Sequence, residues 1–162
     1  MSARLIFFCG KMAAGKSTLS RELAARHDAV LLVQDGWLEK LFPAEILTIP
    51  DFVRCSTRLR EALGPHVVAL LKRGTSVVLD FPGNTRSQRV WFRELFEQAG
   101  VAHELHFIDA PDELCKRQLR LRSQGLPEGA PWTTDAEFDA ITAYFQPPDE
   151  DEGFVVIRHS RS

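Results

Sequence analysis

The stretch that decides the fold is GKMAAGKST, residues 10–18, which lies between the apolar run RLIFFC and the helical pattern LSRELAARH. It matches the pattern G-x-x-x-x-G-K-[ST], in which a curled loop points several backbone N–H groups into one concavity. The helix that begins after the loop adds the positive end of its dipole at the same point. The stretch therefore predicts a site for the phosphates of a nucleoside triphosphate.

Two residues at the end of this loop are suited to act on the triphosphate directly. The Lys16 amine can reach the outer phosphates, and the Ser17 hydroxyl can ligate Mg²⁺. No N-K-x-D pattern for guanine follows, so ATP is favoured over GTP. The predicted cofactor-binding residues of the loop are Gly10, Lys11, Met12, Ala13, Ala14, Gly15, Lys16, Ser17 and Thr18.

Length and composition favour one globular domain over residues 1–162, with 44% hydrophobic and 26% charged residues. The formal net charge of -2 argues against a long nucleic-acid footprint. The three cysteines are far apart and show no metal spacing, so we expect reduced, buried thiols. The sequence has neither a signal-peptide pattern nor an apolar window of roughly 18 residues, and we expect a cytoplasmic protein without a membrane span.

Strands and helices are predicted to alternate along the chain. The expected strands are 4–9, 30–34, 76–80, 104–109 and 154–158, and the expected helices are 16–27, 35–42, 52–73, 85–98, 111–123 and 135–145. The strand runs are apolar throughout rather than alternating, which is typical of a parallel sheet covered on both faces. The chain is therefore expected to be an α/β protein.

Several helix ends and turns carry their own signals. Asp51 is placed to cap the helix at 52–73, and Gly64-Pro65 should kink or split that helix. Thr85 and Gln88 have the spacing of a capping box. The acidic segment PPDEDEG, residues 147–153, is most simply a solvated loop.

Two carboxylates come at the ends of predicted strands. Because ligands of an open α/β sheet bind outside the carboxyl ends of its strands, Asp35 should face the phosphate loop from the neighbouring strand. Asp35 could accept a proton from a substrate hydroxyl, and it also suits the N-cap of the helix at 35–42. Asp80 resembles the acidic residue that holds Mg²⁺ at the end of a hydrophobic strand, although a turn residue before FPGN is the alternative.

Arginines on the helix at 111–123 are candidates for stabilising the transferred phosphate. At about 100° per residue, the apolar arc of this helix is defined by Leu114, Cys115, Leu119 and Leu121. Arg122 falls inside the arc and needs an anionic partner, which could be a transferring phosphate or a structural salt bridge. Arg117 flanks the arc, and Arg120 points away from it.

Other arginines could bind the acceptor. Arg86 and Arg89 open the helix after the third strand, and Arg54 and Arg58 lie one turn apart on the long helix. Surface charge on amphipathic helices explains each of them equally simply. Arg58 and Arg86 are the two predicted acceptor-binding residues.

These motifs together resemble the small P-loop kinases described as AAA-like ATP-binding proteins, which are similar to zeta toxin, chloramphenicol phosphotransferase and the kinase half of polynucleotide kinase. The resemblance covers nearly the whole chain and rests on GKMAAGKST, QDGWLEKLF, VVLDFPGNTRSQR, DAPDELCKRQLRLRS and FQPPDEDEGFVVIR. It implies a three-layer P-loop NTPase fold with a five-stranded parallel sheet of order 2-3-1-4-5, helices on both faces and a small lid at about 117–133.

The resemblance also implies roles for individual residues. Lys16 and Ser17 would hold the triphosphate and Mg²⁺, Asp35 would be the general base, and Arg122 would be the lid arginine. Gln118 stands where a second arginine is common, so Arg117 could supply the lid charge instead. No recognisable acceptor-binding insertion is present, and the resemblance therefore transfers no substrate.

The sequence thus predicts an ATP- and Mg²⁺-dependent kinase in which Lys16, Asp35 and Arg122 are catalytic and Ser17 and Asp80 hold the metal. The predicted acceptor is the hydroxyl of a small molecule. Two alternatives remain, a nucleic-acid 5′-end kinase and a nucleotide-binding regulatory ATPase. The oligomeric state is not indicated by the sequence.

Overall fold

The computed structural model describes residues 2–123 and 135–161, and the side chains of residues 122 and 123 lie outside the described part. The strands are β1 (Arg4–Gly10), β2 (Val30–Val33), β3 (Val77–Asp80), β4 (Ala102–Asp109) and β5 (Val156–Ser160). The helices are α1 (Lys16–Arg26), α2 (Gln34–Leu41), α3 (Ile49–Lys72), α4 (Arg86–Ala99), α5 (Asp112–Ser123) and α6 (Asp135–Thr142), with the 3₁₀ turn η1 (Glu150–Glu152). Helices and strands alternate as predicted.

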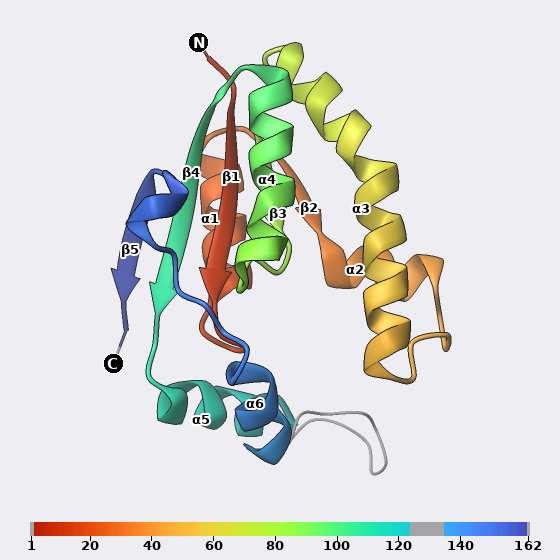
Figure 1. Ribbon diagram of the computed structural model, residues 1–162, viewed down its shortest axis with the longest axis vertical. Coiled ribbons are helices and arrows are strands. Elements are labelled where there is room, and N and C mark those ends of the chain that lie inside the picture. The colour runs from red at the N-terminus through yellow and green to blue at the C-terminus, as the bar shows by residue number, and fades with distance from the viewer. Residues whose placement is uncertain (1, 124–134, 162) are drawn as a thin grey trace.

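The strands form one parallel sheet in the order β2-β3-β1-β4-β5, which confirms the expected fold class. In Figure 1, α1 covers one face of the sheet, α3 and α4 cover the other, and α5 and α6 lie beyond the carboxyl ends of the strands. Because all strands run the same way, the end of β1 and the ends of its neighbours open onto one common edge. That edge carries the phosphate loop.

Burial explains why the central strand β1 is apolar along most of its length, whereas the edge strand β5 is largely exposed and carries Arg158 and His159. In β1, Phe7 faces the α3 and α4 layer and Phe8 faces α1, and both are fully buried. Phe7 stacks on Phe92 of α4 with ring centroids 4.6 Å apart. A strand covered on both faces needs a hydrophobic residue at every position, and that requirement produces the sequence signal.

Helix α3 differs from expectation at its start, and of the two outcomes expected at Pro65, a kink or a split, the split does not occur. Thr48, not Asp51, is the N-cap, because the Thr48 hydroxyl accepts from the Asp51 N–H (3.2 Å) and Asp51 fills the third helical position of a capping box. The helix also continues through Pro65 as one element. A buried Val or Leu contributes about 1.5–3 kcal/mol, so the residues buried on both sides of Pro65 outweigh the roughly 3 kcal/mol that proline costs.

Other boundaries follow the sequence more closely. The predicted capping box of α4 is present, with Thr85 accepting from the Gln88 N–H (3.1 Å) and Gln88 accepting from the Thr85 N–H (3.2 Å). Gly100 ends that helix at φ 68°. Strand β5 begins two residues later than predicted, because Phe154 packs its ring against Phe7 and Phe96 before the ladder starts.

The acidic segment 147–153 was expected to be solvated, and for Glu152 that expectation is wrong. Glu152 receives two hydrogen bonds from Arg89 of α4, from Nε at 2.8 Å and from Nη2 at 3.1 Å. The Arg89 side chain has no exposed surface. Its Nη1 donates to the carbonyls of Gly83 (2.9 Å) and Gln146 (2.8 Å). A buried guanidinium requires such full pairing, and the acidic segment supplies the matching charge.

All three cysteines are buried and unbonded. Burial raises the pKa of Cys9 to about 11, against the opposing charges of Arg89 and Lys16, so this thiol stays protonated at neutral pH. None of the helices formed by residues 2–123 and 135–161 is long and apolar enough to cross a membrane.

We predict that Glu152→Gln lowers the free energy of unfolding by about 3 kcal/mol, because it leaves the buried Arg89 charge without a partner. Burial would raise the pKa of Glu152, but hydrogen bonding from Arg89 outweighs it and the pKa is lowered. The stabilisation should therefore be present at neutral pH and fade as the pH falls through that lowered pKa. Urea denaturation at several pH values measures it.

The matched control is Asp151→Asn, which removes the neighbouring exposed carboxylate that pairs with Arg86 at 2.8 Å. That variant should unfold almost like the parent protein, since exposed ion pairs contribute little. Equal unfolding curves for Glu152→Gln and the parent at neutral pH would refute the structural role given to the buried pair.

Candidate functional site

The phosphate loop, residues 10–18, joins the buried end of β1 to the start of α1. Ala13 and Gly15 have positive φ angles of 62° and 111°, which curl the backbone before the helix begins at Lys16. Among the described residues no side chain caps this helix start. Its first N–H groups are therefore available for an anion, as a phosphate site requires.

Two side chains distant in sequence hold the loop in this shape. The Asn84 side-chain oxygen accepts from the Gly10 N–H at 2.8 Å, and Arg161 donates from Nη1 to the Ala14 carbonyl at 2.8 Å. A Cβ on Gly15 would lie 2.0 Å from that Arg161 nitrogen. Gly15 is thus required by its φ angle, and a side chain there would also displace the Arg161 guanidinium from the loop.

The other predicted residues of the phosphate loop differ in their burial and in their contacts. Lys11 pairs with Asp112 at the start of α5 (2.7 Å), and this pairing directs its charge away from the helix end. Ala13 and Ala14 are buried against α5 and α6, and Thr18 is exposed on α1.

Three charged residues converge where β3 meets the loop. Strand β3 lies between β1 and β2, so Asp80, rather than Asp35, occupies the strand next to the phosphate loop. Asp35 follows β2 in the first turn of α2. Burial raises the pKa of the Asp80 carboxyl, the Lys16 charge opposes that rise, and the Asp35 charge adds to it. Lys16 and Asp35 therefore both lie close enough to Asp80 for their charges to act on its carboxyl.

The oxygen ligands on this edge fit a Mg²⁺ ion that also binds phosphate. The ion usually takes one or two protein oxygens and completes its shell with water and substrate phosphates. Asp80 offers a carboxylate beside Ser20, whose hydroxyl lies 3.4 Å from it, and Ser17 stands in the first turn of α1. A cation here would also relieve the cost of burying the Asp80 charge.

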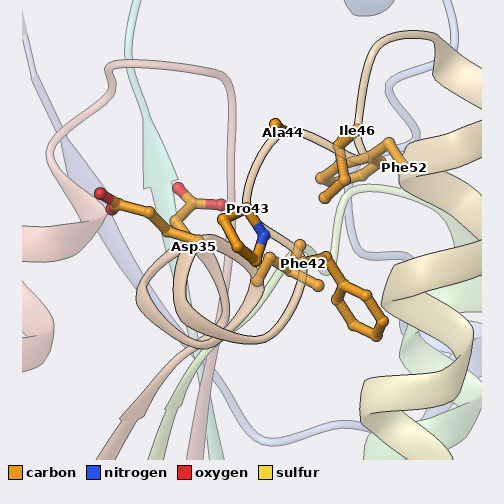
Figure 2. Close-up of a pocket in the computed structure, with 8 residues that line it drawn as sticks. Asp35, Phe42, Pro43, Ala44, Ile46 and Phe52 are labelled. Atoms are coloured by element: carbon orange, nitrogen blue, oxygen red, sulfur yellow. The ribbon is translucent and has the colours of Figure 1, made fainter.

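A pocket of about 400 Å³ opens beside Asp35. Figure 2 shows Asp35 on one side of this pocket and Phe42, Ile46 and Phe52 on the other. Carboxylates therefore meet an apolar wall built from α2, the loop after it and the start of α3. Such a mixture of a few polar groups and apolar walls is typical of small-molecule sites.

The predicted arginines lie in different surroundings. Arg58 is exposed on α3, and Arg117 is exposed on α5. Arg86 pairs with Asp151 (2.8 Å) and Asp149 (3.6 Å) of the acidic segment. Arg122 belongs to the last turn of α5, but its side chain and most of the predicted lid fall outside the described residues.

Helix α5 packs along a narrower arc than predicted. Leu114, Cys115 and Leu119 are buried against the phosphate loop and Phe138 of α6, whereas Leu121 is 55% exposed. Leu121 was wrongly assigned to the apolar arc, because the loop and α6 cover only one side of the helix. Arg120 pairs with Asp135 at 3.2 Å on the exposed side.

Sequence reasoning missed several residues of this edge. Asn84 was read only as part of a turn, and Arg161 carries no local pattern at all. Arg60 of α3 was also overlooked, although it reaches the Pro82 carbonyl directly after β3. Only the three-dimensional arrangement brings these residues to the site.

We predict that Asp80→Asn raises the melting temperature by about 2 °C when Mg²⁺ is absent and weakens Mg²⁺-dependent nucleotide binding. Because the pKa of Asp80 is raised in the folded state, the ionised carboxylate lowers the free energy of unfolding at pH values above that pKa. Asparagine carries no charge and removes this destabilisation. Thermal melts with and without Mg²⁺–ATP measure both effects. Glu22→Gln, which alters an exposed carboxylate of α1, is the control and should do neither. A lower melting temperature for Asp80→Asn without Mg²⁺ would contradict the prediction.

We predict that Arg161→Ala weakens ATP binding about 10-fold, because the loop loses the hydrogen bond at Ala14 that holds its shape. Isothermal titration with ATP measures the affinity. Arg158→Ala is the control, since Arg158 of β5 pairs with Asp109 and not with the loop. Equal affinities in the two variants would show that Arg161 does not position the loop.

Comparison with known proteins agrees with this fold. Residues 5–148 match the AAA domain family. A proposed kinase from Chloroflexus aurantiacus j-10-fl is 19% identical, has a TM-score of 0.74, and the match covers 98% of this chain and 85% of that one. The APS kinase of Mycobacterium tuberculosis, solved with AMPPNP and APS, is 18% identical, with a TM-score of 0.64 and coverage of 99% and 91%.

A gluconokinase from Sinorhizobium meliloti 1021 is 16% identical, with a TM-score of 0.63 and coverage of 99% and 84%. No curated protein sequence matches the chain. At these identities the structural likeness establishes the fold, which these kinases share with this chain. Since the family match spans most of the sequence, the protein belongs to the AAA domain family and has the P-loop fold of small kinases.

Proposed function

We propose that this protein is an ATP- and Mg²⁺-dependent phosphotransferase that moves the γ-phosphoryl group of ATP to a hydroxyl of a small molecule. The observation that carries the proposal is the convergence of Lys16, Asp80 and Asp35 on one edge of the sheet. The kinase-like fold and the AMPPNP held by the similar APS kinase support ATP as the donor. Each of the three side chains has a distinct task in such a transfer.

Lys16 and the N–H groups at the start of α1 would bind the β- and γ-phosphates and stabilise the charge that grows on them. Asp35, at the mouth of the pocket, would accept the proton of the acceptor hydroxyl. The hydroxyl oxygen then bonds to the γ-phosphorus while the bond from phosphorus to the β–γ bridging oxygen breaks. ADP and the phosphorylated acceptor are the products.

Ser17 and Asp80 would hold the Mg²⁺ ion, which neutralises phosphate charge when bound. Arg122 and Arg117 of α5 are the proposed lid arginines. The pocket beside Asp35 favours a small acceptor, because its walls are apolar and its volume is about 400 Å³.

The arrangement of carboxylates favours transfer over the alternatives. A regulatory ATPase needs no carboxylate at the mouth of an acceptor pocket, whereas Asp35 lines one. A nucleic-acid 5′-end kinase would benefit from a basic surface, and the formal net charge is -2. An assay with labelled ATP separates the three functions. Transfer to a small hydroxylated compound indicates the proposed kinase, transfer to an oligonucleotide indicates the 5′-end kinase, and hydrolysis without any acceptor indicates the regulatory ATPase.

We predict that Asp35→Asn lowers the rate of phosphoryl transfer at least about 100-fold while ATP affinity stays within about 2-fold. The asparagine keeps the shape of the side chain but cannot accept the proton. Transfer kinetics and isothermal titration with ATP measure the two quantities. Glu45→Gln, an exposed residue of the loop after α2, is the control and should transfer at the parental rate. Near-parental transfer by Asp35→Asn would disprove the assignment of the base.

A further inference from the structure

Polar atoms without partners gather beside the proposed acceptor pocket. In the described part of the chain, four buried side-chain atoms have no hydrogen-bond partner, and they belong to Gln34, Ser56 and Arg60. Gln34 is 1% exposed and Ser56 is 6% exposed. Buried polar groups are nearly always paired in folded proteins, so three such residues in one region point to a missing ligand.

The three residues lie around the carboxyl ends of β2 and β3. Gln34 directly precedes Asp35 and follows Val33, whose partner in register is Asp80. Ser56 and Arg60 are one turn apart on α3, on the face that begins with Phe52 of the pocket wall.

Arg60 reaches the Pro82 carbonyl, which lies at most about 7 Å along the chain from Asp80. The three residues do not line the pocket itself, but Gln34 adjoins its residue Asp35, and Ser56 and Arg60 continue along α3 from its residue Phe52.

Arg60 is the unusual member of the group because it is charged. Its guanidinium has five N–H donors, but among the described residues it donates only one long hydrogen bond, to Pro82 at 3.4 Å. Its flat face lies 5.5 Å from the centre of the Trp91 ring. No carboxylate of the described residues forms an ion pair with it, and its burial lowers the pKa of the guanidinium.

Arg89 is a buried arginine with a structural role, and its hydrogen-bond pairing can be compared with that of Arg60. Arg89 is paired with Glu152 and with backbone carbonyls through all its nitrogens. Arg60 has no carboxylate partner among the described residues and donates only the long hydrogen bond to Pro82. A largely buried cation without a carboxylate costs stability, and binding of an anion would offset that cost.

We propose that Arg60, with Ser56 and Gln34, forms an anion subsite, so that the acceptor is a small hydroxy compound bearing a phosphate or carboxylate group. The inference rests on the proposed phosphotransferase function for the hydroxyl end of that acceptor. Arg60 pairs with the anionic group, Ser56 and Gln34 hydrogen-bond to it or to a neighbouring hydroxyl, and Asp35 receives the hydroxyl that is phosphorylated. The subsite selects acid acceptors over neutral ones of the same size.

Fluorescence of Trp91 tests the anion subsite without any catalysis, because its ring lies against Arg60. The parent for this experiment carries Trp37→Phe and Trp132→Phe, and inorganic phosphate is the titrant. We expect a saturable change in emission as phosphate binds. The Kd for phosphate should rise at least about 10-fold in Arg60→Met and less in Arg60→Lys, which keeps the charge but loses the planar guanidinium that can donate two parallel hydrogen bonds. Lys72→Met, which removes an exposed cation of the same helix, should bind phosphate like the parent.

Lys16→Ala separates this subsite from the phosphate loop, since the phosphate signal should persist in that variant. Arg60→Met should melt no lower than the parent, because it removes a charge that has no carboxylate partner. No saturable signal in the parent, parental affinity in Arg60→Met, or loss of the signal in Lys16→Ala instead would overturn the anion subsite. A marked loss of stability in Arg60→Met would also count against it.

Transfer assays with matched acceptors test the selectivity. Two pairs of acceptors are compared, glycerate with glycerol and glucose 6-phosphate with glucose. Within each pair, only the first compound bears an anionic group. We expect kcat/KM to favour an acid over its neutral partner by at least about 30-fold, and Arg60→Met to abolish that preference through KM. Equal use of acids and neutral compounds would overturn the inference and leave the proposed function standing. Phosphate binding at Arg60 with no transfer to any acceptor would support the subsite and reject the phosphotransferase.

Discussion

The ion pair of the buried Arg89 guanidinium with Glu152 is the interaction on which the phosphate-loop edge of the sheet depends. The guanidinium ties α4 to the Gly83 carbonyl after β3 and to Glu152 in the tail. Gly83 is pressed against β1, where a Cβ would lie 2.3 Å from the Phe8 carbonyl, and the next residue, Asn84, holds the Gly10 N–H. One ion pair thus fixes the turn that supports the phosphate loop, although neither of its residues faces the nucleotide site.

The opposite side of the loop is held by the end of the chain. Arg161 follows β5 and binds the Ala14 carbonyl, while its own N–H donates to the Asp109 carbonyl at 2.9 Å. The two supports clamp the loop from α4 and from β5, and this leaves the helix start free to bind an anion. The side chains on the other side of this edge are paired less fully: burial raises the pKa of Asp80, and Arg60 Nε has no hydrogen-bond partner among the described residues. Poor pairing at the site and full pairing behind it are the pattern expected when binding groups are held ready for a ligand.

The sequence predicts the parts of this structure that depend on local chemistry. The apolar run of β1, the phosphate loop and the capping box at Thr85 each carry a pattern within a few residues, and these three were found where expected. The strand order came from resemblance rather than from physics. An error arose where tertiary packing decides, at Glu152, whose buried partner is 63 positions away. Asn84, Arg60 and Arg161 could not be found for the same reason, since nothing in their local sequence shows which segment they meet.

Nucleotide and acceptor are expected to meet between the phosphate loop and the pocket beside Asp35. A crystal structure of the complex with AMPPNP and Mg²⁺ tests this arrangement most directly. The γ-phosphate should lie between the Lys16 amine and the Asp35 carboxylate, with the ion near Ser17 and Asp80. A γ-phosphate directed away from Asp35, with the pocket closed off from it, would contradict the assignment of this protein as a phosphotransferase.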